Sequence, residues 1–168
     1  MRWPVILPWL RTIVRVGLGV VWIVAGVLKI GDPAQSVAAV RAYELLPDAV
    51  AQLLGWALPY LEILLGLVLI SGLFTRWAAA LSGLLQLAFI VGLLQAWARG
   101  LSIDCGCFSA GGQVAASQTK YPQELARDLV FLAGAVWLFI QPLTRLSLDA
   151  ITGGYAQPAR AHDDEENA

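Results

Sequence analysis

The feature that most constrains the fold of this chain is a run of 22 residues without a charged side chain, Trp77–Ala98, bounded by Arg76 and Arg99. As an α-helix, such a run extends about 33 Å at 1.5 Å per residue. That length crosses the roughly 30 Å hydrocarbon core of a bilayer. A β-strand is excluded because the run is continuously apolar, rich in Leu and Ala, and too long. The run therefore predicts a transmembrane helix.

Three further segments have the same character. The segment 12–30 carries Arg15 and Lys29 near its ends, where long basic side chains can reach the membrane surface. The segment 57–75 contains a single charge, Glu62. The segment 125–143 is anchored near its start by Arg127 and Asp128 and after its end by Arg145. We therefore expect an all-α fold, a polytopic membrane four-helix bundle over residues 12–145, with spans at about 12–30, 57–75, 77–98 and 125–143.

The remaining segments have other compositions. Residues 1–11 form a basic N-terminal segment, and Lys29 stands where a signal peptidase site would begin, so we expect the first span to be retained. Residues 31–48 mix charged and apolar side chains, which predicts an interfacial amphipathic helix between the first two spans. The tail from 146 to 168 is polar, and we expect it to be disordered.

Composition and charge narrow the class of protein further. The chain is 58% hydrophobic and 14% charged, against about 45–50% and 25% for a soluble domain. These values exclude an ordinary water-soluble globule and a basic nucleic-acid binder. Arg2, Arg11 and Arg15 precede or open the first span, so the excess of basic residues on cytoplasmic segments predicts that both termini are cytoplasmic. The loop 100–121 and the amphipathic segment then face outward.

The sequence Asp104-Cys105-Gly106-Cys107 carries the clearest chemistry. Thiols two residues apart form a disulfide only across a tight turn, which Gly106 permits. Strained disulfides are more oxidising and are often catalytic, so Cys105 and Cys107 are a candidate redox pair. The alternatives are free thiols, a static disulfide that would stabilise little, or half of a zinc site.

We expect no metal site, because zinc usually takes four ligands and the only histidine, His162, lies in the tail. The attacking species in disulfide exchange is a thiolate. Asp104 disfavours that anion by like charge unless a base such as Arg99 compensates.

Glu62 is the second candidate, because an acid inside a membrane span is costly and often functional. It is a possible proton relay for thiol oxidation, and with Lys29 and Arg41 it is a possible quinone site. The structural alternative is a buried ion pair with Lys29 or Arg41 that fixes helix packing. Lys29, Asp32 and Arg41 would also suit lipid head groups.

Four stretches carry a resemblance to a known family: AGVLKIGDP at 25–33, RAYELLP at 41–47, LPYLEILLGLVLISGLFTRWAA at 58–79, and DCGCF at 104–108. With these motifs the chain resembles the MauE (methylamine utilisation) branch of the DoxX-like bacterial membrane proteins. The resemblance implies a four-helix protein of the bacterial plasma (inner) membrane. It also implies thiol–disulfide exchange through Cys105 and Cys107 with an extracytoplasmic thioredoxin-like partner, a link to quinones, and maturation of a client protein.

The sequence holds only two cysteines, so the second disulfide of many quinone-linked thiol oxidases is missing and a separate thioredoxin-like protein would be needed. The leading hypothesis is thus a membrane thiol–disulfide oxidoreductase component. The main alternative is a non-catalytic assembly or anchor subunit of a redox complex. A small-solute transporter using Glu62 is a weaker alternative, since no inverted repeat is evident.

Overall fold

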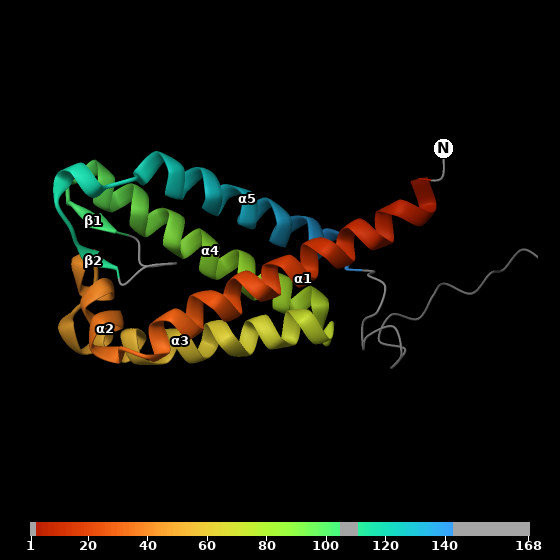
Figure 1. Cartoon of the computed structure of the whole chain (residues 1–168), viewed down its shortest axis with the longest axis horizontal. Coiled ribbons are helices and arrows are strands. Elements are labelled where there is room, and N and C mark those ends of the chain that lie inside the picture. Colours follow the sequence, from red (N-terminus) through yellow and green to blue (C-terminus); the bar gives the residue numbers. More distant parts are fainter. Residues whose placement is uncertain (1–2, 105–110, 143–168) are drawn as a thin grey trace, which may run out of the picture.

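The computed structural model describes residues 3–104 and 111–142. Four long helices, α1 (Trp3–Ile30), α3 (Asp48–Ser71), α4 (Thr75–Ala98) and α5 (Tyr121–Ile140), run alongside one another as an elongated bundle (Figure 1). The short helix α2 (Pro33–Ala42), the strands β1 (Ile103–Asp104) and β2 (Gly112–Gln113), and the 3-10 turn η1 (Ala116–Gln118) gather at one end. We call this end the hairpin end, and the end holding the α3–α4 connection the turn end. The predicted all-α bundle is confirmed.

Three of the described helices are long and apolar enough to cross a membrane: α1 from Ile6, α3 and α4, with mean hydropathies of 2.0 to 2.1. They also present large apolar side chains outward, among them Leu53, Leu64 and Trp77. Such extensive exposed apolar surface is unusual for a soluble monomer. The chain is therefore a polytopic membrane protein.

The fourth predicted span corresponds to α5, which packs along α4 and α1. Three charged residues, Glu124, Arg127 and Asp128, lie within its first eight positions, so it is less apolar than the other three helices. The uncharged part, Leu129–Ile140, extends about 18 Å as a helix. A membrane crossing by α5 stays a prediction.

Two helices begin earlier than predicted. α1 begins at Trp3 rather than near residue 12, so most of the basic N-terminal segment 1–11 is helical. Pro8 is accommodated inside this helix, and its carbonyl accepts a hydrogen bond from the Thr12 hydroxyl (2.9 Å). α3 begins at Asp48, nine residues before the predicted span. These extra turns pack on α2, because a Cβ at Gly55 would lie 2.5 Å from the Cα of Val37.

The predicted amphipathic segment 31–48 contains α2, which covers its first part. Asp32 caps this helix by accepting a hydrogen bond from the Gln35 amide (3.0 Å), and Pro33 occupies the first helical position. Both choices favour helix initiation there. After α2 the chain turns through Glu44, whose positive φ of 50° ends the helical path before α3.

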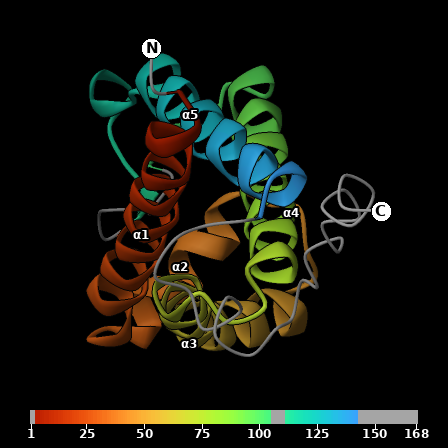
Figure 2. The ribbon, with the colours of Figure 1, turned by 90° about the vertical axis from the view of Figure 1, so that its right-hand side faces the viewer.

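Small residues bring α1 and α3 into close contact. A Cβ at Gly26 would lie 2.5 Å from the Pro59 carbonyl oxygen, and one at Gly19 would lie 2.9 Å from the carbonyl oxygen of Gly66. Such small residues let helix backbones approach closely in membranes. The two helices are antiparallel, since the later residue of α1 meets the earlier residue of α3. Figure 2, a view along the bundle, shows α1 and α3 as neighbours and α5 beside α4.

Candidate functional site

The candidate redox pair, Cys105 and Cys107, lies outside the described residues. The structure does describe the chain on either side. β1 and β2 pair in antiparallel fashion, with Ile103 opposite Gln113 and Asp104 opposite Gly112. The chain therefore leaves the described part at Asp104 and returns at Gly111 close to the same point. That point is at the hairpin end of the bundle (Figure 1).

Helices hold both ends of this segment in place. The Gln35 side-chain amide of α2 donates a hydrogen bond to the Gly111 carbonyl (2.8 Å). The Tyr121 hydroxyl of α5 donates to the Leu101 carbonyl and accepts from the Ile103 amide (3.3 Å). Tyr121 is itself buried and stacks on Trp97 of α4 at a ring distance of 5.9 Å. The flanks of the cysteine segment are thus fixed by side chains from three helices.

Arg99, the base considered as compensation for Asp104, forms an ion pair with Glu44. Its guanidinium lies 2.6 Å from a carboxylate oxygen of Glu44 and also donates to the Glu44 carbonyl (3.4 Å). These contacts join the end of α4 to the connection between α2 and α3. Arg99 therefore braces the hairpin end.

Glu62 lies in the interior of the bundle and forms an ion pair with Lys29. The Lys29 Nζ to Glu62 Oε1 distance is 2.6 Å, with 12% and 1% of the two side chains exposed. Lys29 belongs to the last turn of α1, so Glu62 lies level with the hairpin end of that helix. Arg41 is not brought to this pair. It lies on α2 and pairs with Asp48 at 2.6 Å, with both side chains well exposed.

The structure adds two residues to this group that the sequence analysis did not select. Asp128 of α5 is 1% exposed and lies 3.0 Å from Arg127, and Gln86 of α4 is buried and lines the same cavity as Asp128. Glu62, Gln86 and Asp128 line one small cavity of about 20 Å³ together with Trp22 of α1. Each of the four long helices thus contributes one of these side chains to the lining of the same cavity.

One signal in the sequence could have led to Gln86. It stands near the middle of the otherwise uncharged span 77–98, four residues after Ser82 and so on the same helix face. Ser82 is buried too, and its hydroxyl accepts a hydrogen bond of 2.6 Å from the Trp22 indole. A polar pair at this spacing in a membrane helix marks the face that points into the bundle.

The interior cavity does not fit a quinone. Its volume of about 20 Å³ suffices for about one water molecule, whereas small-molecule sites usually measure about 300–1,000 Å³. The Lys29 ammonium group also donates its hydrogen bond to the Glu62 carboxylate rather than to a ligand. We therefore derive no step through a quinone at this position.

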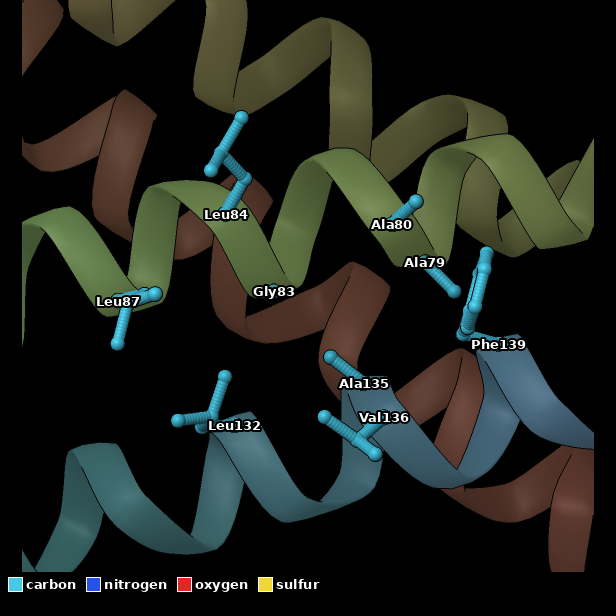
Figure 3. A pocket seen from close by; sticks show the side chains of 9 residues that line it. All are labelled: Ala79, Ala80, Gly83, Leu84, Leu87, Leu132, Ala135, Val136 and Phe139. Carbon is cyan, nitrogen blue, oxygen red and sulfur yellow. The ribbon is translucent and has the colours of Figure 1, made fainter.

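A larger hollow of about 320 Å³ lies between α4 and α5. Figure 3 shows Gly83 and Leu87 of α4 facing Leu132 and Val136 of α5 across it. Only apolar residues and one glycine line this hollow. It can accommodate an apolar chain, but its walls offer no side chain that would bind a polar head group or move a proton.

Comparison with known proteins identifies the chain. The model of one protein family, described as methylamine utilisation protein MauE, matches residues 7–141. No curated protein and no solved structure matches it. The matched region includes both cysteines. It also includes all five described α-helices, except for the first residues of α1. The chain therefore belongs to the family of the methylamine utilisation protein MauE.

Proposed function

We propose that this MauE-family membrane protein is a thiol–disulfide redox protein. Cys105 and Cys107 exchange electrons with an extracytoplasmic thioredoxin-like partner and so support disulfide formation in, or maturation of, a client protein of methylamine utilisation. The observation that carries the proposal is that Asp104 and Gly112, which flank the cysteine segment, are paired in a hairpin at one end of the bundle.

The anchoring of this hairpin supports a role in exchange. Gln35 and Tyr121 hold its two strands to α2 and α5. Reactive groups supported by rigid elements meet a partner with less loss of conformational freedom than groups on a free loop. A cysteine pair presented from such a base suits repeated encounters with a partner protein.

The exchange proceeds in two displacements when the partner is oxidised. A thiolate of the reduced partner attacks one sulfur of the Cys105–Cys107 disulfide, which breaks that bond and forms a mixed disulfide. The partner's second thiolate then attacks the mixed disulfide and releases the protein with both cysteines reduced. Two electrons have passed from the partner to the cysteine pair. Reoxidation needs an acceptor of two electrons and two protons. A quinone of the membrane, becoming a quinol, is the proposed class, and it would have to act outside the small cavity beside Glu62.

The orientation of the protein is part of the proposal. Arg11 of α1 donates a hydrogen bond to the side chain of Gln141, so the N-terminal part of α1 contacts the end of α5 away from the hairpin, and the first turns of α1 extend beyond that contact (Figure 1). Three arginines before or within the first turns of the span favour a cytoplasmic position for this end. The hairpin end then faces outward from the bacterial inner membrane, where thioredoxin-like oxidants act on secreted clients.

Trapping of the mixed disulfide tests the proposal. The Cys107→Ser and Cys105→Ser variants of the full chain are each purified from the native membrane under acid quenching, and bound proteins are identified by mass spectrometry. We expect one of the two variants to capture a thioredoxin-like protein through a bond that reductant releases. The control is the Cys105→Ser/Cys107→Ser variant, which should capture nothing.

The same double variant separates the proposal from the main alternative. Under thiol exchange, reoxidation of the partner should stop in the double variant while the protein level in the membrane is unchanged. Normal client maturation in that variant would instead favour a non-catalytic assembly or anchor subunit.

A further inference from the structure

Two buried carboxylate oxygens, on residues that line one interior cavity, have no hydrogen-bond partner among the described residues. They are Oε2 of Glu62 and Oδ2 of Asp128, and the two residues are 0% and 1% exposed. The other oxygen of each carboxylate forms an ion pair: Glu62 Oε1 with Lys29, and Asp128 Oδ1 with Arg127. A buried acceptor without a donor is costly, so each of these oxygens calls for a donor.

Both residues line the same interior cavity, although they come from different helices. Glu62 belongs to α3 and Asp128 to α5, while Gln86 of α4 also lines it. The cavity measures about 20 Å³. A buried water molecule needs at least about 10–15 Å³ of such space and two to four polar partners. Size and lining therefore fit a single water molecule, and the two O–H groups of one water match the two acceptors.

We propose that this cavity binds one water molecule, which donates one hydrogen bond to Glu62 Oε2 and one to Asp128 Oδ2. The bridge joins the Lys29–Glu62 pair to the Arg127–Asp128 pair. Two cations and two carboxylates meet there, so the charged site is balanced without an additional proton. A proton that arrives at Glu62 can pass to the water as the water releases one of its own to Asp128. The site thus connects α3 and α5 for proton transfer, and it does not depend on the cysteines.

Radiolytic hydroxyl footprinting of the full chain in nanodiscs tests the proposal, because bound water becomes the local source of hydroxyl radicals. We expect Trp22, which is buried and lines the cavity, to be oxidised several-fold faster in the wild type than in Ala25→Val. Ala25 also lines the cavity, so the added methyl groups fill the space of the water. The matched control is Ala88→Val, the same change at an exposed position of α4. Equal oxidation of Trp22 in wild type and Ala25→Val would overturn the proposal.

A second measurement decides the question if Ala25→Val does not fold. Glu62→Gln and Asp128→Asn keep the shape of each side chain, and their midpoints of thermal unfolding are compared with that of the double variant. With a shared water, the first change already disturbs the bridge, so the double variant should lose clearly less than the two single losses combined. Strictly additive losses would show independent carboxylates and overturn the proposal.

Discussion

Lys29 in the last turn of α1 and Glu62 in α3 form an ion pair across the helix interface, with 2.6 Å between nitrogen and oxygen. Only 1% of the Glu62 side chain is exposed, so the carboxylate depends on Lys29 for compensation. Removal of one partner from a buried pair is far more harmful than replacement of both, because the remaining charge is left in an apolar environment.

We predict that Lys29→Met lowers the free energy of unfolding by about 3–5 kcal/mol. The variant Lys29→Met/Glu62→Gln should recover most of this loss, since neither member of the pair then carries a charge. Unfolding in detergent can be followed by the fluorescence of the seven tryptophans. Arg41→Met is the control, because its pair with Asp48 is exposed and should contribute about 1 kcal/mol or less. A loss in Lys29→Met no greater than in Arg41→Met would contradict the prediction.

The contact between α1 and α3 yields a second prediction. A Cβ at Gly26 would lie 2.5 Å from the backbone oxygen of Pro59. Because backbone atoms cannot move aside as the end of a side chain can, Gly26→Ala should push the helices apart and lower the midpoint of thermal unfolding. Gly17→Ala is the matched control on the same helix, where a Cβ meets no atom within 4 Å. It should be neutral or stabilising, since Ala favours a helix over Gly by about 0.5–1 kcal/mol. Equal effects of the two changes would argue against close packing at Gly26.

The sequence was sufficient to predict the bundle but only part of its interior site. Long uncharged runs predicted the helices, since apolar length alone identifies membrane segments. Glu62 was conspicuous as a lone charge in a span, and a buried pair with Lys29 or Arg41 was the structural alternative to a proton relay; the structure has the pair with Lys29. The choice between the two cations depends on the position of α2, which places Arg41 beside Asp48.

Asp128 was not selected because it stands beside Arg127 at the predicted start of a span, where charges normally face water or head groups. Its burial depends on the rotation and the axial position of α5 against α4. A shift of one helical turn is about 5.4 Å and would separate Asp128 from Gln86. Such an offset between helices distant in the chain leaves no pattern in a single sequence. The N-terminal extension of α1 was missed for a different reason, since Pro8 and the charges before residue 12 resemble a segment outside a helix.

A third prediction concerns the base of the hairpin. The Tyr121 hydroxyl bonds both the Leu101 carbonyl and the Ile103 amide, so Tyr121→Phe leaves two backbone groups without their side-chain partner. Loss of such a bond typically costs about 1–3 kcal/mol when the groups stay buried. Hydrogen–deuterium exchange should show faster exchange of the Ile103 amide while the amides of α3 are unchanged. Tyr60→Phe, at an exposed position of α3, provides the control. Unchanged exchange at Ile103 would show that other contacts hold β1.

The last prediction concerns the direction in which the bundle crosses the membrane. Ser117 is exposed in η1 at the hairpin end, and Leu73 lies in the α3–α4 connection at the turn end (Figure 1). Each is replaced by Cys in a Cys105→Ser/Cys107→Ser background and treated in intact spheroplasts with a maleimide that does not cross membranes. Because the hairpin end is proposed to face outward, Ser117→Cys should be labelled in intact cells and Leu73→Cys only after permeabilisation. The reverse pattern would place the cysteine pair on the cytoplasmic side, where glutathione and thioredoxin keep thiols reduced. Exchange with an extracytoplasmic partner would then be impossible, whereas the interior site around Glu62 and Asp128 would be unaffected.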